Sequence, residues 1–417
     1  MKRKFKISSL LRFRGIAILA VLGPGFITAN VDNDPGGILT YSQAGAKFGY
    51  TLLWTLIPIT IALIIVQEMA ARMGAVTGKG LSDLIREEFG LRATFFTLAL
   101  LGLADMGNIA AEFAGIASGF GILGVSKYLT VPIGAFVVWI VIVRGSYKGI
   151  EKLLLLFSFL YFSYFISAFL AHPNWRVAAK ETVVPHVLHG SDYIVMLIGL
   201  VGTTITPWMQ FYLQASIVEK GIRAKDYALS RIDVIIGCIF TDVVAFFIVV
   251  ACAATLYSSG THDITDASQA ATALAPLAGR FAGLLFAIGL INAALLSAAI
   301  LPLATAYNIC EGMGFESGVD KTFGEAKVFY WLYTALIAFG AGVVLLPHIP
   351  LIKLIIFSQV ANGILLPFVL FYMLKLINRH DLMGTYTNSR FGNAIAYSTS
   401  VVMIVLTVAF LYTLIFQ

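Results

Sequence analysis

A short motif in the middle of the first apolar segment, Asn33–Gly37, constrains the fold of this chain more than any other feature. It reads Asn-Asp-Pro-Gly-Gly, with apolar sequence before it and again from Ile38 onward. Proline removes a backbone donor, glycine weakens a helix, and a charge at mid-bilayer costs ~2.5–3.5 kcal/mol on insertion scales. Irregular backbone at that depth is tolerated only where it is buried in protein or lines a wet cavity. We therefore predict a discontinuous helix whose break carries a cation site.

The rest of the chain has the composition of an integral membrane protein. Hydrophobic residues make up 59% of it and charged residues only 12%, whereas soluble domains have ~25% charged residues. Apolar runs recur that are long enough to cross ~30 Å of hydrocarbon. We predict one all-α membrane domain with about eleven spans, at residues 16–46 (broken), 51–74, 93–122, 128–145, 152–172, 191–219 (broken), 231–258, 278–310, 327–346, 350–377 and 394–416.

The positions of lysine and arginine predict the orientation in the membrane. With the N-terminus in the cytoplasm, 22 of the 28 basic residues fall on the cytoplasmic side, including a basic tail at residues 1–15. The positive-inside rule accounts for this bias, so the net charge of +6 requires no nucleic-acid partner. We expect an integral protein of a bacterial inner membrane, in contact with lipid and with a cytoplasmic N-terminus. The three cysteines show no metal-ligand spacing and are expected to be core residues.

A second interruption lies in the sixth predicted span, where Thr203–Trp208 reads Thr-Thr-Ile-Thr-Pro-Trp. Five spans separate the two breaks, so the halves that they begin have opposite orientations. Paired interruptions of this kind are typical of inverted-repeat transporters with a site at the membrane midplane. Each preceding half-helix ends in unpaired carbonyls, around Val31 and Thr203, and Asp34 adds a full negative charge. Two breaks in register therefore favour a cation site over a kinked helix with a buried aspartate.

Several motifs in combination resemble the NRAMP family of divalent-metal transporters. They are Gly23–Phe26 through Asp34–Gly37 to Gln43–Ala46, Val76–Lys79, Ser358–Val360 with Leu366–Phe368, and Leu382–Gly384. The resemblance covers nearly all of the chain. It implies a LeuT-like fold with discontinuous helices 1 and 6, built from two inverted five-helix repeats, here 16–172 and 191–377, plus an eleventh helix at 394–416.

Two departures from the family's motifs bear on the transported ion. The first motif of the family ends in Asn where this chain has Gly37, and its Met-Pro-His in the sixth span is Thr206–Trp208 here. Losing a thioether removes a preference for softer ions and leaves an all-oxygen site, which glycine makes roomier. Mg²⁺ keeps several waters and needs such room. The pattern resembles the magnesium-transporting branch of the family, with Mn²⁺ also carried.

The metal ligands predicted on this basis are Asp34 as the charged ligand, Thr206 directly or through water, and the carbonyls of Thr203 and Val31, with Gly37 giving the site its room. Trp208 either forms a wall of the cavity or simply packs in the core.

The residues used for proton transfer are depleted. None of the six histidines falls deep within a predicted span, and the family's acidic pair on the third span is Ile109 and Glu112 here. Proton relay through a membrane uses chains of His and carboxylate groups. We therefore predict transport that is uncoupled from protons and driven by the ion gradient and the membrane potential, which supplies a divalent ion with ~4.6 kcal/mol at 100 mV.

Other polar residues inside the predicted spans have two interpretations each. Asp105, Asn108 and Glu112 share one face of the third span and form either an ion or water pathway or a hydrogen-bonded stripe between helices. Gln359 and Asn362 either complete the shell of the ion during occlusion or join two helices.

For Asp242 a functional role is favoured, because acids inside membranes are usually functional.

The sequence is compatible with three functions. The first is alternating-access import of Mg²⁺ and Mn²⁺. The second is proton-coupled Mn²⁺ or Fe²⁺ transport by a member of the same family with relocated ligands. The third is sodium-coupled symport of an organic solute on the same fold, which is disfavoured because Asp34 places an anion where a substrate carboxylate would dock. An enzyme is not expected, since no nucleophile–base pair or phosphate loop occurs, and no cofactor is predicted besides the transported ion.

Overall fold

The computed structural model describes residues 23–416 apart from 32, 145–161, 189 and 320, and the regular elements in these residues are all helical. The predicted basic tail, the start of the first span and the first part of the fifth span, residues 152–161, lie outside the described residues. The helices are α2 (Pro24–Val31), α3 (Pro35–Phe48), α4 (Leu56–Thr77), α5 (Leu81–Ile122), α6 (Lys127–Arg144), α8 (Phe162–Leu170), α9 (Trp175–Val183), α10 (Ser191–Thr204), α11 (Pro207–Glu219), α12 (Tyr227–Cys252), α13 (Ala267–Ala271), α14 (Ala275–Ala278), α15 (Ala282–Met313), α16 (Lys327–Leu345), α17 (Leu351–Ile377), α18 (His380–Met383) and α19 (Arg390–Phe416).

Among the described residues, 9 helical stretches are long and apolar enough to cross a membrane. They correspond to nine of the eleven predicted spans. The first predicted span is present as α2 and α3, which are each too short to be counted, and the fifth is described only from Phe162. Helix α5 starts earlier than predicted, because it continues back to Leu81 through a bend at Gly90, whose φ of 82° favours glycine.

Both predicted helix breaks are present, and they have the same local cause. Asp34 and Thr206 each precede a proline and are extended, with ψ of −179° and 132°. A proline disfavours the helical conformation in the residue before it. It is well tolerated at the first position of a helix, where its missing N–H would be unpaired anyway. Pro35 and Pro207 therefore end one half-helix and begin the next, giving the pairs α2/α3 and α10/α11.

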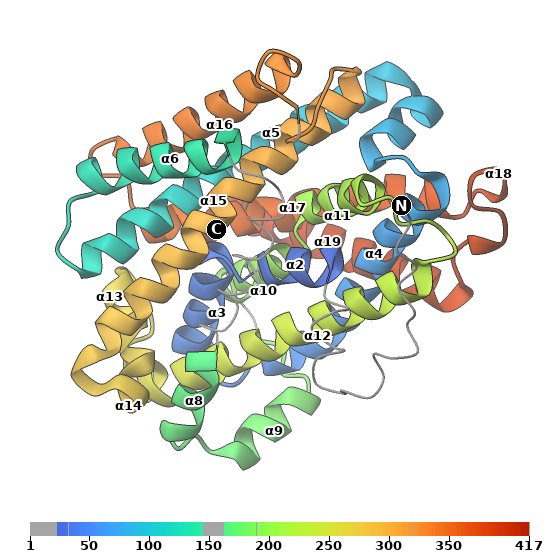
Figure 1. Ribbon diagram of the computed structural model, residues 1–417. Coiled ribbons are helices and arrows are strands. Elements are labelled where there is room, and N and C mark those ends of the chain that lie inside the picture. Colours follow the sequence, from blue (N-terminus) through green and yellow to red (C-terminus); the bar gives the residue numbers. More distant parts are fainter. Residues whose placement is uncertain (1–22, 32, 145–161, 189, 320, 417) are drawn as a thin grey trace, which may run out of the picture.

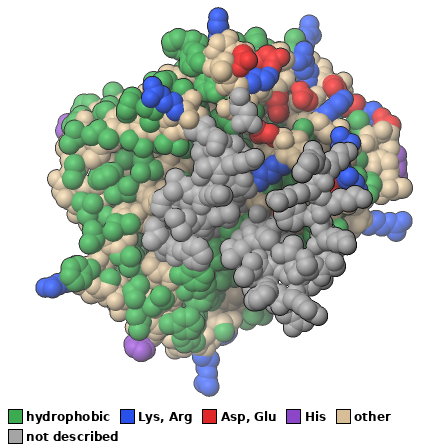
Figure 2. All heavy atoms as spheres, viewed as in Figure 1, with side chains coloured by type: hydrophobic (Ala, Val, Ile, Leu, Met, Phe, Trp, Pro, Cys, Tyr) green, Lys and Arg blue, Asp and Glu red, His purple; other side chains and the backbone are tan. Residues whose placement is uncertain are grey.

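The half-helices lie at the centre of the bundle, enclosed by long helices such as α5, α12, α15 and α17 (Figure 1). Figure 2 shows hydrophobic side chains over much of one side of the molecule, while acidic and basic side chains gather toward the upper right. Helix α19 presents a row of exposed apolar side chains that includes Val401, Val405 and Val408. This distribution fits a bundle whose outer surface contacts lipid tails.

Helix α12 holds α2 at both ends. The Asp233 carboxylate accepts hydrogen bonds from three backbone amides at the start of α2, at 2.7, 2.8 and 3.2 Å; the donors are Gly23, Gly25 and Phe26. At the other end, the Thr241 hydroxyl donates to the carbonyl of Ala29. Gly25 and Gly237 permit the close approach of the two helices. A Cβ on Gly237 would lie 2.7 Å from the Cα of Phe26, and a Cβ on Gly25 would lie 2.7 Å from the Cα of Val234. The first half-helix is thus fixed to α12 by polar groups that satisfy its open ends.

Candidate functional site

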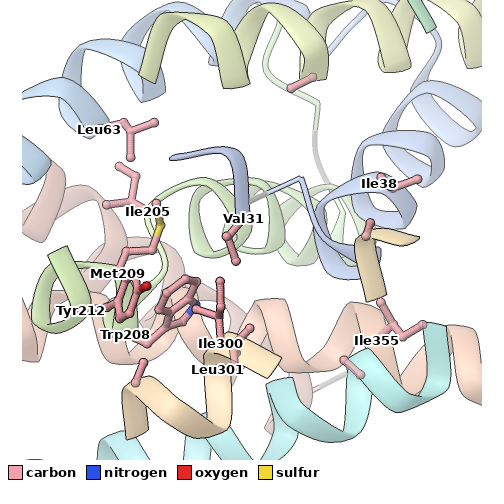
Figure 3. Packing of buried hydrophobic residues seen from close by; sticks show 14 of the residues in the cluster. Val31, Ile38, Leu63, Ile205, Trp208, Met209, Tyr212, Ile300, Leu301 and Ile355 are labelled. Carbon is pink, nitrogen blue, oxygen red and sulfur yellow. The ribbon is translucent and has the colours of Figure 1, made fainter. Parts of the chain in front are cut away.

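The two helix breaks are neighbours in the interior. The hydroxyl groups of Tyr41 on α3 and Thr204 at the end of α10 lie 2.6 Å apart and form a hydrogen bond between the two half-helix pairs. Figure 3 shows Val31, the last residue of α2, facing the same space as Trp208 of α11, with Ile300 of α15 beside them. The end of α10 therefore lies against α3, and the end of α2 lies near the start of α11.

Asp34 caps the second half of the first broken helix. Its Oδ1 accepts a hydrogen bond from the Gly37 amide at 2.7 Å, and its side chain is buried. An aspartate in this position is favourable, because helix α3 directs the positive end of its dipole at the carboxylate. Gly37, predicted as part of the site for the room it leaves, also serves as this backbone donor. The same carboxyl group also interacts with Glu112.

Glu112 brings a second carboxyl group to Asp34. It lies on α5, is fully buried and interacts electrostatically with Asp34. No N–H or hydroxyl donor among the described residues reaches either of its oxygens, so the Asp34 carboxyl group is its polar neighbour. Helix α5 reaches this point because Gly115 lacks a side chain: a Cβ there would lie 2.3 Å from Cγ of Pro35. Two buried carboxylates side by side are favourable only with a cation or a proton between them.

Gln359 of α17 lies next to Asp34 at the first helix break. A Cβ on Gly36 would lie 2.2 Å from Nε2 of Gln359 and 2.8 Å from Oδ1 of Asp34, so the amide and the carboxylate both border this glycine. The Gln359 amide donates to the Ser358 hydroxyl at 3.0 Å, and its Oε1 accepts from Asn362 at 3.1 Å. Of the two α17 residues singled out in the sequence, Gln359 therefore adjoins the acidic pair.

Asn362, the hydrogen-bond partner of Gln359, joins α17 to α5. It exchanges two hydrogen bonds of 2.9 Å with Asn108 of α5. Asp105, one turn earlier on α5, accepts from the Thr305 hydroxyl of α15 at 2.7 Å, and its other oxygen has no partner in the described part of the chain. The polar face predicted on the third span is present, but its three members turn to three different neighbours.

The second break contributes neutral oxygens. The Thr206 hydroxyl donates to the carbonyl of Thr203 at 2.9 Å, so two of the predicted ligands are joined in one turn. The Thr203 hydroxyl is 1% exposed and has no partner among the residues described. Trp208 is buried, with its ring 5.9 Å from that of Tyr212, and packs toward Ile300 (Figure 3).

Asp242 is buried on α12 beside Thr60 of α4. In the described ranges, no three His, Cys, Asp or Glu side chains form a group that could hold a metal. The candidate site is therefore two carboxylates, an amide and the neutral oxygens of two helix ends.

Two solved structures share this architecture. The chain superimposes on the Eremococcus coleocola manganese transporter, crystallised with an aromatic bis-isothiourea compound, with a TM-score of 0.75 at 22% identity, covering 94% of this chain and 86% of that one. It also matches Mhp1, a nucleobase-cation-symport-1 family transporter, with a TM-score of 0.58 at 14% identity over 94% of this chain and 92% of that one. These likenesses confirm the predicted LeuT-like fold with its two discontinuous helices.

The family follows from the sequence comparison. The family model for natural resistance-associated macrophage protein-like (Nramp) proteins matches residues 25–413, and the chain belongs to this family. It is 28% identical over 380 residues to the divalent metal cation transporter MntH of Pectobacterium carotovorum, covering 89% of each chain. It is 30% identical over 399 residues to MntH of Ralstonia nicotianae, covering 91% of this chain and 88% of the relative.

Proposed function

We propose that this protein carries divalent metal ions across the membrane by alternating access, and that the ion binds between the two helix breaks. The observation that carries the proposal is the pairing of Asp34 with Glu112 at the meeting point of two half-helices. Carbonyl ends, a hydroxyl and carboxylates are the hard oxygen ligands that Mg²⁺ and Mn²⁺ prefer. The relatives named as divalent metal cation transporters support the same substrate class.

Mg²⁺, with Mn²⁺ as a second substrate, is our proposal for the ion. Thr206 and Gly37 stand where the family has a thioether and an amide, so the proposed ligands contain no sulfur. A site lined by oxygen gives a soft transition metal no advantage over abundant Mg²⁺, and the room at Gly37 suits an ion that keeps part of its water shell. This assignment would place the chain in the magnesium-transporting branch of the family.

We propose that import is not coupled to protons and is driven by the ion gradient and the membrane potential. A potential of 100 mV supplies a divalent ion with ~4.6 kcal/mol, enough for a roughly two-thousandfold gradient without protons. We also propose that the N-terminus is cytoplasmic and that residues 16–172 and 191–377 are the inverted repeats.

Proton-coupled transport of Mn²⁺ or Fe²⁺ is the second candidate, and one contact favours it. The Glu112 and Asp34 carboxyl groups are neighbours, no N–H or hydroxyl donor in the described structure reaches Glu112, and such a pair can hold a proton between its members when the metal is absent. A sodium-coupled organic symporter is less favoured, because two carboxylates would repel the carboxylate of an amino-acid substrate.

The test is ion uptake into proteoliposomes that contain a pH indicator and carry an inside-negative potential. The first proposal expects Mg²⁺ and Mn²⁺ to enter while the internal pH stays flat. Acidification in proportion to metal uptake would establish the proton-coupled alternative instead. Liposomes with the Asp34→Asn variant control for leak, and wild-type flux in that variant would remove the proposed site.

A further inference from the structure

A groove runs along the outer side of α4, between that helix and α12 and α19. One end is a cavity of about 460 Å³ whose lining along α4 is apolar first and charged toward the end of the helix. The residues that matter are Ile61, Ile64, Ile65, Glu68, Arg72 and Arg231. Such a division between an apolar wall and a charged end fits an amphiphile rather than a soluble metabolite.

The groove continues past this cavity. A second cavity of about 470 Å³ lies between α4, α10 and α19, has an almost entirely apolar lining, and shares Ile61 with the first. The linings extend along α4 from Trp54, just before the helix, to Arg72, a distance of about 27 Å at ~1.5 Å rise per residue. This length matches the hydrocarbon thickness of a bilayer, with the arginines at one boundary.

The charged end contains positively charged groups that the neighbouring acidic side chain does not fully neutralise. Arg72 is held by Glu68 at 3.1 Å, by the Asn388 side chain at 2.7 Å and by the Thr387 carbonyl at 3.2 Å. Its Nε is buried and makes no hydrogen bond within the described residues. Arg231 is exposed, lies close enough to act electrostatically on Arg72, and forms no ion pair in the part of the chain that the structure describes.

The net charge of this end is therefore positive, with two arginines against one glutamate. Helix α19 begins at Arg390, and its first turn contributes Phe391 and Gly392 to the lining. The positive end of its dipole adds to the field of the arginines. An occupant of the charged end should carry a negative group that accepts hydrogen bonds.

We propose that the groove binds an anionic phospholipid from the leaflet that contacts the arginine-rich ends of α4 and α12. Its phosphate would bind the exposed Arg231, since guanidinium groups match phosphate oxygens, and Arg72 beside it would add to the attraction. One acyl chain would lie along Ile61, Ile64 and Ile65. The excess of positive charge selects an anionic headgroup over a zwitterionic one.

Lipid titration of the purified full-length protein, followed by native mass spectrometry, tests this site with phosphatidylglycerol and phosphatidylcholine as the probes. Arg231→Gln should weaken phosphatidylglycerol binding about fivefold, the effect of one basic side chain at a membrane surface, and leave phosphatidylcholine binding unchanged. Thr385→Glu, which adds a negative charge to the lining, should act in the same direction. The matched control is Arg223→Gln, an exposed arginine outside the lining.

Equal binding of the two lipids by the wild-type protein would overturn the proposal. So would a loss in the Arg223 variant as large as that in the Arg231 variant, or wild-type binding in both groove variants. Glycerol phosphate, which has no acyl chain, should not displace the lipid, and displacement at equal concentration would contradict the role of the apolar wall.

Discussion

Gly36→Ala tests whether Gln359 and Asp34 border the ion together. The added methyl group would lie 2.2 Å from Nε2 of Gln359, where ordinary contact begins at 3.4 Å, so the amide would have to retreat by about 1.2 Å. Its bonds to Ser358 and Asn362 oppose that movement. The substitution should therefore displace the amide, and to a smaller extent the Asp34 carboxylate at 2.8 Å, while the helix itself, in which alanine is favoured over glycine, stays intact.

The magnitude follows from the loss of one polar contact to a charged group. Such contacts are worth ~1.5–3 kcal/mol, so the apparent KM for Mn²⁺ uptake should rise roughly ten- to a hundredfold. The assay is initial-rate uptake in proteoliposomes, with thermal unfolding to check the fold. Gly102→Ala is the matched control, because a Cβ at that α5 glycine meets nothing within 4 Å.

The double variant with Gln359→Ala sharpens the test. Removing the amide removes the closer of the two contacts and leaves only the one at 2.8 Å from Oδ1 of Asp34. Gly36→Ala should therefore have a smaller effect in that background than in the wild-type protein, and the two changes should be non-additive. A wild-type KM in Gly36→Ala, or full additivity with Gln359→Ala, would refute the arrangement described above.

Three further changes test separate parts of the account. Glu112→Gln should raise the KM for divalent ions about tenfold or more, since it removes one of two adjacent charges; if it instead abolishes a measured proton flux and leaves metal affinity intact, the group is a proton carrier. Gly37→Asn combined with Thr206→Met should shift the uptake preference toward Mn²⁺, and an unchanged Mg²⁺ to Mn²⁺ ratio would show that selectivity lies elsewhere. Gly202→Ala should lower the melting temperature, because its Cβ would lie 2.0 Å from the Gln359 carbonyl oxygen and overpacking costs ~1–3 kcal/mol, whereas Gly289→Ala, with nothing within 4 Å, should not.

Local chemistry explains why the breaks could be predicted from the sequence. Asp34-Pro35 and Thr206-Pro207 each contain their own reason to interrupt a helix, and apolar length is enough to locate most spans. The position of Asp34 at the start of α3 follows from the same dipeptide, because the residue before an N-terminal proline is the cap.

Contacts between distant segments could not be predicted in the same way. Glu112 is adjacent to Asp34 only because Gly115 lets α5 approach Pro35, and helical spacing alone placed Glu112 with Asp105 on a common face. The capping of α2 by Asp233 was also missed, since it joins residues more than two hundred positions apart. The sequence does show that the first amides of α2, at Gly23–Phe26, need an acceptor from outside the helix, but it does not show which residue supplies that acceptor.

The most direct test of the account is equilibrium binding of Mg²⁺ and Mn²⁺ to the purified wild-type protein and to Asp34→Asn, measured by calorimetry. Asparagine can still cap α3, so the substitution removes the charge and keeps the helix start. Both ions should bind saturably to the wild-type protein and not at all to the folded variant. Binding of either ion to Asp34→Asn with wild-type affinity would contradict it.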